Sequence, residues 1–254
     1  MRLAAIQHDI VWEDAEATCA HVAPMIADAA ARQARLIVLP EMFATGFSMH
    51  PERTAEPEGG FTEQFLREQA SMHGAYLLGT IAQQGADGNY RNNAVLAAPD
   101  GTVHRYAKIH PFTYSGEHEH YAAGDRHLTV EVDGLRVTVF ICYDLRFADE
   151  FWARAPETDL YLLPSNWPER RRDHWRALLP ARAIENQAYV LGVNRVGIAG
   201  TVKHLDYVGD SALIDPMGHT VFEGGPEEAV LVADVEADAV SRARRDFPFL
   251  ADRR

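Results

Sequence analysis

The chain has 254 residues, of which 47% are hydrophobic and 24% are charged, and its formal net charge is −13. These proportions are ordinary for a soluble globular protein, and the length is sufficient to bury a large core. The acidic balance argues against nucleic acid or an anionic membrane as a partner, because both attract basic surfaces. The one basic run, residues 169–172, is interpreted as the solvated start of a helix.

The cysteine content and the amino terminus predict a cytoplasmic protein. The two cysteines, Cys19 and Cys142, argue against a disulfide framework as the basis of the fold, so a reducing compartment is expected. The first residues lead directly into an apolar run without a charged leader, and no apolar stretch is long enough to cross a bilayer.

Short apolar runs alternate with helical patterns along the chain, which predicts an α/β layered domain. The predicted strands cover residues 3–8, 36–40, 75–81, 93–98, 103–107, 128–132, 136–141, 160–164, 188–194, 211–214 and 230–234. The predicted helices cover residues 15–35, 62–73, 149–155, 174–186 and 237–245. Tight-turn sequences such as Asp87-Gly88-Asn89 and Asp133-Gly134 separate several strands, so mixed sheets are expected.

No linker, low-complexity tract or repeat divides the chain, which predicts a single domain over residues 1–254. A tail begins at about residue 246 and contains Phe247, Phe249 and Leu250. These apolar side chains predict that the tail docks on the body or on a partner. Residues 112–125 contain few apolar side chains and are interpreted as a long loop, which in a compact domain is often functional.

Three reactive side chains occur where predicted strands end. Cys142 follows the apolar run 137–141, Glu41 follows 36–40, and Lys108 follows 103–107. Because ligands of open α/β sheets gather at the carboxyl ends of strands, these residues are candidates for one site. Each also has an ordinary interpretation: a core cysteine, an exposed carboxylate and a solvated lysine.

A thiol, a carboxylate and an amine together can attack a carbonyl group. The thiolate is the nucleophilic form of cysteine, and Lys108 favours it whereas Glu41 opposes it. Glu41 is therefore expected to accept the thiol proton as attack occurs. The Lys108 ammonium and the backbone N–H of Tyr143 are expected to stabilise the resulting oxyanion.

The sequence around these residues resembles the nitrilase superfamily of carbon–nitrogen hydrolases, and within it the omega-amidase-like branch. Eight segments match in order and spacing, and with their flanks they extend the resemblance over nearly the whole chain. They are residues 39–47, 108–112, 116–121, 142–147, 165–168, 181–187, 192–195 and 215–218.

The resemblance implies an αββα sandwich, in which two mixed β-sheets are flanked by helices. It also implies a catalytic triad of Glu41 as general base, Lys108 as electrostatic partner and Cys142 as nucleophile, with Glu117 as a second active-site glutamate. No metal or organic cofactor is required. Family members usually associate near the nucleophile-bearing strand and the following helix, so a homodimer is expected.

Other polar and aromatic residues have weaker assignments. Arg146 is expected to contact substrate or to pair with Asp144, and Phe43 and Trp167 are expected to line the pocket or to pack in the core. Arg182 and Glu185 are spaced for an ion pair on one helix. The histidines at positions 104, 110, 118 and 120 lack the helical spacing of the familiar zinc motif, which argues against a metal site.

The branch resemblance implies an amidase that hydrolyses the ω-amide of α-ketoglutaramate or α-ketosuccinamate through a cysteinyl thioester. Alternatives within the family are a deaminated-glutathione-type amidase, an N-carbamoyl amidase and a nitrilase. Alternatives outside it are a non-catalytic binding module and a redox-sensing thiol protein. Two departures from the branch, at Ala148 and at residues 197–200, leave the substrate preference open.

Overall fold

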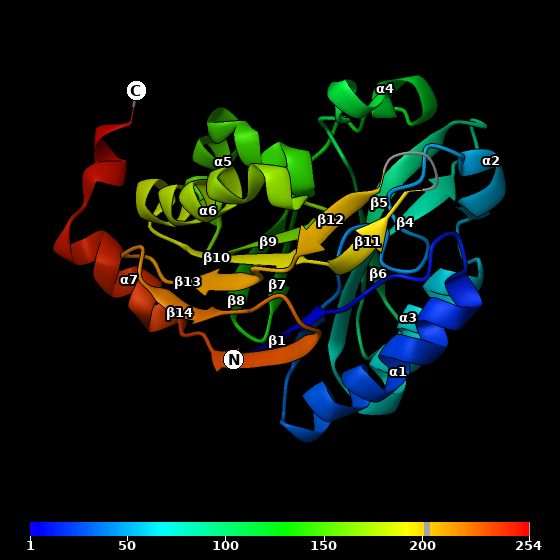
Figure 1. Ribbon diagram of the computed structural model, residues 1–254. Coiled ribbons are helices and arrows are strands. Elements are labelled where there is room, and N and C mark those ends of the chain that lie inside the picture. The colour runs from blue at the N-terminus through cyan, green and yellow to red at the C-terminus, as the bar shows by residue number, and fades with distance from the viewer. Residues whose placement is uncertain (201–203, 254) are drawn as a thin grey trace.

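Two large β-sheets form the centre of the computed structural model, which describes residues 1–200 and 204–253 (Figure 1). The first sheet has seven strands in the order β15-β1-β2-β4-β5-β6, with β3 paired to β4. Strands β1, β2 and β4 are parallel, and β15, β5 and β6 are added antiparallel to their neighbours. Its strands are β1 (Arg2–Gln7), β2 (Leu36–Val38), β3 (Glu56–Pro57), β4 (Tyr76–Gln84), β5 (Tyr90–Ala97), β6 (Val103–Ala107) and β15 (Ala229–Asp234).

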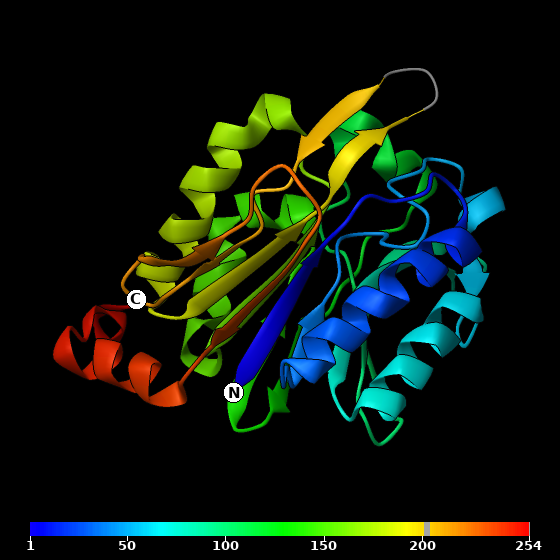
Figure 2. The ribbon, with the colours of Figure 1, turned by 60° about the horizontal axis from the view of Figure 1, so that its bottom comes forward.

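The second sheet has six strands in the order β14-β13-β10-β9-β8-β7, with β8, β9 and β10 parallel. Its strands are β7 (Leu128–Val132), β8 (Leu135–Val139), β9 (Leu160–Ser165), β10 (Tyr189–Asn194), β13 (Ala212–Ile214) and β14 (Thr220–Glu223). A separate hairpin of β11 (Val196–Ala199) and β12 (Leu205–Val208) extends beyond the end of this sheet, as Figure 2 shows. Both sheets are therefore mixed, as predicted.

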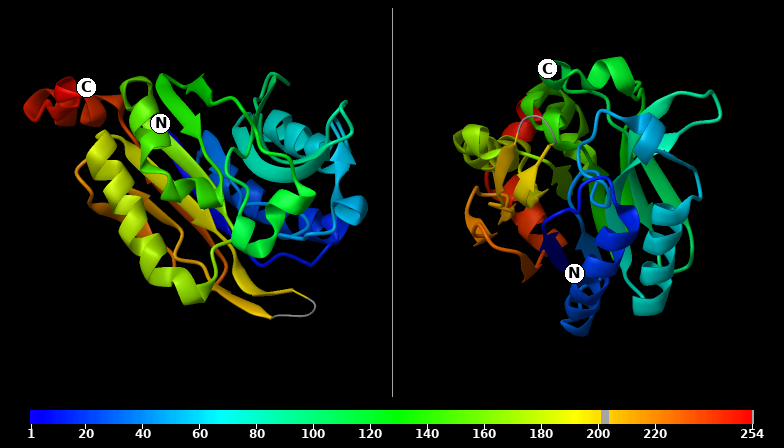
Figure 3. Two further views of the ribbon diagram at one scale, coloured as in Figure 1. Left: turned by 90° about the horizontal axis from the view of Figure 1, so that it is seen from above. Right: turned by 45° about the vertical axis from the view of Figure 1, so that its right-hand side comes forward.

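Helices cover the outer face of each sheet, so the layers run helix, sheet, sheet, helix (Figure 3). Helices α1 (Ala15–Ala31) and α3 (Phe61–His73) lie on the first sheet, and α5 (Ala148–Arg154) and α6 (Arg172–Asn186) lie on the second. The remaining helical elements are α2 (Pro51–Thr54), α4 (Glu117–His120), α7 (Ala237–Asp246), η1 (Thr113–Ser115), η2 (Cys142–Arg146), η3 (Ala155–Glu157), η4 (Glu169–Arg171) and η5 (Phe249–Asp252). The predicted αββα sandwich is confirmed.

The alternation of side chains along β1 explains this layering. Leu3 and Ala5 belong to the core between the two sheets, whereas Ala4 and Ile6 belong to the core beneath α1 and α3. All four side chains are fully buried. Because successive residues of a strand point to opposite faces, a continuous apolar run is what a strand covered on both faces requires.

Helix α1 ends earlier than the sequence predicted. The Asp14 carboxylate caps its start by accepting the N–H of Ala17 at 3.0 Å. The helix stops at Ala31, and Gln33 has a φ of +66°, which turns the chain out of the helix. The backbone N–H of Arg35 then donates to Arg2 at 2.8 Å, so the last predicted helical residues already lead into the sheet.

The long loop and the chain tail also contain short helices. Residues 112–125, predicted as a loop, contain η1 and α4. The tail contacts the body, because Gln187 Nε2 donates to the Phe247 carbonyl at 2.8 Å and the Arg253 guanidinium lies 4.8 Å from the Trp152 ring centroid. Within the described ranges, no helix combines the length and the apolar character needed to cross a membrane.

Candidate active site

The carboxyl ends of strands from both sheets meet at one edge of the sandwich. Glu41 follows β2 and Lys108 follows β6 in the first sheet, whereas Cys142 and Asn166 follow β8 and β9 in the second. Strand β6 runs in the same direction as β4, because each is antiparallel to β5. The chain direction of these strands therefore brings the four residues to the same edge.

Lys108 joins two carboxylates in the interior of this edge. Its Nζ donates to Glu41 Oε1 at 2.8 Å and to the two Glu117 oxygens at 3.1 and 2.8 Å. Both carboxylates are fully buried, and Lys108 is 1% exposed. Glu117 comes from α4 in the loop 112–125, and its Oε2 also accepts the Phe112 N–H. Such a buried cluster is stable only when each charge has hydrogen-bonding partners.

Asn92 in β5 supplies a further donor that was not predicted from the sequence. Its Nδ2 donates to Glu41 Oε1 at 2.8 Å and to Glu117 Oε1 at 3.1 Å. The Thr80 hydroxyl donates to Asn92 Oδ1 at 2.9 Å, which fixes the orientation of the amide. The predicted strand began at residue 93, one residue after Asn92. The sequence also carries no signal that distinguishes a buried polar side chain within a strand from a polar side chain that faces solvent.

Cys142 lies on a tight turn at the start of η2. Its φ is +44°, in the left-handed region that non-glycine residues rarely adopt, and such a conformation typically costs about 1–3 kcal/mol. The buried Asp144 carboxylate holds the turn, because it accepts the Ile141 N–H at 2.9 Å and the Tyr106 hydroxyl at 2.8 Å. Asp144 also accepts the His110 N–H at 3.0 Å and does not pair with Arg146.

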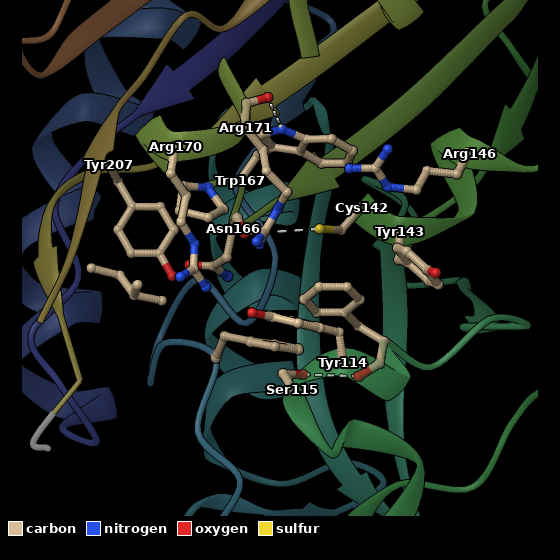
Figure 4. A pocket seen from close by; sticks show the side chains of 14 residues that line it. Tyr114, Ser115, Cys142, Tyr143, Arg146, Asn166, Trp167, Arg170, Arg171 and Tyr207 are labelled. Atoms are coloured by element: carbon tan, nitrogen blue, oxygen red, sulfur yellow. Dashed lines mark hydrogen bonds between the residues drawn. The ribbon is translucent and has the colours of Figure 1, made fainter. Parts of the chain in front are cut away.

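Asn166 contacts both the nucleophile candidate and the base candidate. Its backbone N–H donates to Glu41 Oε2 at 3.0 Å, and its side-chain amide donates to the Glu41 carbonyl. Its own carbonyl oxygen accepts the Cys142 thiol at 3.9 Å (Figure 4). Asn166 therefore fixes the positions of Cys142 and Glu41 relative to each other across the two sheets.

Burial and neighbouring charges set the protonation states. Burial raises the pKa of the Cys142 thiol well above its usual value, Glu41 raises it further, and Lys108 opposes both. Burial acts to lower the pKa of Lys108, but Glu117 and Glu41 outweigh it, so this pKa is raised. Burial raises the pKa of Glu117 despite the nearby ammonium. The resting nucleophile is therefore a neutral thiol beside a charged lysine.

A cavity of about 280 Å³ opens above Cys142. The predicted substrate-binding residues Tyr143, Arg146 and Trp167 line it, and Figure 4 shows them around the sulfur. The Arg146 guanidinium lies 4.7 Å from the Trp167 ring centroid, an arrangement typical of a cation–π contact. The volume lies just below the usual range of ligand pockets, about 300–1,000 Å³, which suits a small substrate.

Phe43 does not line this cavity, so its predicted place in the pocket is wrong. Its side chain is fully buried in the core beneath α3, with its ring centroid 6.4 Å from that of Phe65. The ring packs directly on Gly79 of β4, where a Cβ would come within 2.5 Å of it. Phe47, from the same sequence segment, lines the cavity instead.

The basic run at residues 169–172 is also placed differently from the prediction. It includes η4 and the first residue of α6, but Arg170 and Arg171 line the cavity instead of forming only a solvated helix start. Arg172 pairs with the buried carboxylate of Asp210 at 2.5 Å. The sequence identified the run but gave no signal for which of its guanidinium groups turns toward the site.

The remaining candidates have structural contacts. Arg182 pairs with Glu185 at 2.8 Å, as predicted, and also donates to the Leu145 carbonyl behind the Cys142 turn. The His110 ring stacks on Phe147 at a centroid distance of 3.6 Å. Within residues 1–200 and 204–253, no three His, Cys, Asp or Glu side chains are grouped as metal ligands would be.

Comparison with known proteins assigns the family. The family model described as carbon-nitrogen hydrolase matches residues 2–245. The omega-amidase YafV of Yersinia enterocolitica is 39% identical over 254 residues, which cover 99% of this chain and 96% of the relative. The 2-oxoglutaramate amidase of Bacillus subtilis is 30% identical over 226 residues, which cover 87% of this chain and 85% of the relative.

Solved structures agree with this assignment. A carbon–nitrogen hydrolase superfamily protein from Xanthomonas campestris, crystallised with an arsenic adduct in its active site, has a TM-score of 0.94 and 35% identity. The alignment covers 100% of this chain and 97% of that chain. The chain described here therefore belongs to the carbon-nitrogen hydrolase family and is an omega-amidase-like member of the nitrilase superfamily.

Proposed function

We propose that this enzyme hydrolyses the ω-amide of small α-keto dicarboxylate monoamides, such as α-ketoglutaramate and α-ketosuccinamate, to the dicarboxylate and ammonia. The observation that carries the proposal is the buried cluster of Glu41, Lys108 and Glu117 beside the Cys142 thiol. Relatives named omega-amidase and 2-oxoglutaramate amidase support the substrate class.

The first half of the reaction forms a thioester. Cys142 Sγ bonds to the amide carbon while its proton moves to Glu41, a general-base step typically worth about 10²–10⁴-fold in rate. The raised pKa of the thiol supports proton transfer during attack instead of a preformed thiolate. The Lys108 ammonium and the Tyr143 N–H stabilise the oxyanion. The C–N bond then breaks, and Glu41 gives its proton to the departing ammonia.

The second half returns the free enzyme. Water attacks the thioester carbon and a glutamate accepts its proton. The bond from carbon to Cys142 Sγ then breaks, the carboxylic acid leaves, and the glutamate returns the proton to Sγ, which restores the thiol. Glu117, whose two oxygens both accept from Lys108 Nζ, orients this water or the departing amine. The hydrogen bonds from Asn92 to both carboxylates support a fixed geometry through both steps.

Turnover and intact-protein mass spectrometry test the proposal together. Wild-type protein should release ammonia from α-ketoglutaramate and should show a mass increase that corresponds to a thioester. Cys142→Ala should show neither, while its circular dichroism spectrum stays unchanged. Parallel assays with an N-carbamoyl amino acid, a nitrile and a deaminated-glutathione-type amide provide the comparison. Turnover by pure Cys142→Ala would reject the nucleophile, and a preference for one of the other compounds would reject the substrate class.

The proposal includes a homodimer. Three exposed apolar side chains lie together on one surface, namely Ile184 of α6, Met217 and Phe247, with 50%, 58% and 65% of their area exposed. Met217 and Phe247 line one groove, and Ile184 packs against the backbone of Gly218. Light scattering should give twice the chain mass, and Ile184→Asp should give a monomer. Ile198→Asp, at a similarly exposed site on β11, should remain dimeric.

The proposal also includes a single domain, a cytoplasmic location and no nucleic acid or membrane partner. The match of the family model to residues 2–245 supports one domain with a tail from about residue 246. Cys19 and Cys142 are both free thiols, which fits a reducing compartment. The net charge of −13 supports a small-molecule substrate over a polyanionic partner.

A further inference from the structure

Three guanidinium groups surround the cavity above Cys142. Arg146, Arg170 and Arg171 line it, and none of its lining residues in the described part of the chain is acidic. The chain as a whole carries a net charge of −13, so this concentration of positive charge runs against the composition. A pocket lined by one sign of charge raises the local concentration of the opposite charge.

These guanidinium groups have no carboxylate partner. Across residues 1–200 and 204–253, Asp and Glu oxygens pair with Arg172 and Arg176 on the same segment, but none lies within 4.0 Å of Arg146, Arg170 or Arg171. Each of the three instead lies over an aromatic ring. Arg171 is 5.1 Å from the Phe112 ring centroid, and Arg170 is 5.9 Å from that of Tyr114.

A guanidinium that stacks on a ring keeps its N–H edge available. The ring occupies the face of the planar group, whereas the donors point outward in its plane, where they match the two oxygens of a carboxylate. Arg171 is the member of the set best placed to use this edge. Figure 4 shows its side chain directed into the cavity toward Cys142, whereas Arg170 lies beside Tyr207 and Arg146 approaches from the opposite side.

The surroundings of Arg171 are unfavourable for an unpaired cation. Burial lowers its pKa, and the nearby charges of Arg170 and Arg146 lower it further. Arg146 has an alternative partner, because its Nη2 lies 3.2 Å from His174 Nδ1, whereas no side-chain hydrogen bond of Arg171 is present in the described residues. An anion bound in the cavity would neutralise the buried positive charge of the Arg171 guanidinium.

We infer that Arg171, on the side of the cavity opposite Arg146, binds the carboxylate of the substrate and sets the preference of this enzyme for anionic amides over neutral ones. This inference rests on the proposed function, since it names the residue that recognises the charged end of the monoamide. The carboxylate makes two N–H···O bonds to Arg171, and this anchors the amide carbon above Cys142. Neutral amides of the same length lack this anchor.

Substrate preference tests the inference. The kcat/KM for α-ketoglutaramate should fall about 10- to 100-fold in Arg171→Met, mainly through KM, because a hydrogen-bonded charge pair is lost. The kcat/KM for pentanamide should change far less, so the ratio of the two values collapses. Arg171→Lys should be intermediate, because it keeps the charge without the fork. Arg126→Met, which removes the same charge from a side chain 91% exposed, is the control and should keep the wild-type ratio.

A binding measurement separates this inference from the proposed function. Glutarate should protect Cys142 from alkylation by iodoacetamide in the wild type and in Arg126→Met, but about 10-fold more weakly in Arg171→Met. An unchanged ratio of kcat/KM values together with unchanged protection in Arg171→Met would overturn the inference. If the wild type does not hydrolyse α-ketoglutaramate, the proposed function fails, and succinamate with the glutarate protection assay still decides the role of Arg171.

Discussion

The substitution Lys108→Met tests the buried charge cluster most directly. It keeps an unbranched side chain one atom shorter but removes three hydrogen bonds to Glu41 and Glu117, of 2.8, 3.1 and 2.8 Å. Two carboxylates at 0% exposure then lie side by side without a cation. Breaking a buried ion pair by removing one partner typically costs about 3–5 kcal/mol. Two partners share this lysine, so the upper end of that range is expected, which is a large part of a typical stability of about 5–15 kcal/mol.

The stability deficit should depend on pH with a definite sign. Burial already raises the pKa of Glu117, and loss of the ammonium that opposes this effect raises it further. A carboxyl group whose folded-state pKa is raised favours folding at low pH, and this contribution is lost as pH rises through the folded pKa. The deficit of Lys108→Met relative to wild type should therefore be largest at neutral pH and should shrink as pH falls toward the unfolded value of about 4.3.

Urea unfolding of both proteins at about pH 7.5 and about pH 5.5 measures this difference. The double variant Lys108→Met/Glu117→Gln should recover part of the stability, because it removes one of the two uncompensated carboxylates. Arg126→Met controls for loss of a positive charge at the surface. A deficit below about 1 kcal/mol, or one that is the same at both pH values, would refute the reasoning. Turnover of Lys108→Met should fall by at least about 10²–10³-fold, the typical cost of one oxyanion donor.

Three further predictions concern the same site. Asn92→Leu should lower kcat about 10- to 100-fold, because Glu41 and Glu117 each lose a hydrogen-bond donor. The control is Asn93→Leu, which removes an amide that donates to Gln83 at 3.0 Å; this variant should keep the wild-type kcat even if it unfolds at a lower temperature. Equal kcat values for the two variants would contradict the prediction. The raised pKa of Cys142 predicts that iodoacetamide alkylates this thiol slowly near neutral pH and that the alkylation rate rises steeply as pH increases. An alkylation rate that is independent of pH from about 6 to 9 would instead show a preformed thiolate. Chelators should leave turnover unchanged, and inhibition that added zinc reverses would reveal a metal.

The alternation of strand-like and helical patterns predicts an α/β domain, and the ends of the predicted strands mark the reactive side chains, whereas the αββα arrangement and the roles of the triad were implied by the family resemblance. The apolar runs before Glu41 and Cys142 are readable as buried strands. The run before Lys108, which includes His104 and Arg105, is instead a mostly half-buried strand at the edge of the first sheet. The short strands β3, β11, β12 and β14, of two to four residues, were missed because too few residues repeat the pattern. The seventeen residues of α1 were recognised, but its end was not, since Gln33 leaves the helix without a glycine or proline to mark the turn.

The supporting contacts could not be predicted for a different reason. Asn92, Thr80 and Asn166 act through partners that are far away in sequence, and their roles depend on which face of a strand or turn each side chain occupies. The prediction that Phe43 lines the pocket was wrong for the same reason, because the direction of its side chain could not be inferred. It lies in an irregular turn after β2, where no period of two or of 3.6 fixes the direction of a side chain. Its direction is decided by the space that Gly79 leaves on the neighbouring strand.

The division of the reactive groups between the two sheets has a consequence for how activity is acquired. Glu41 and Lys108 are carried by one half of the sandwich, and Cys142 and Asn166 are carried by the other. Neither half contains a working centre, however well its own strands are paired. During refolding, the return of catalysis should therefore lag behind the return of secondary structure and report the moment at which the two halves dock face to face.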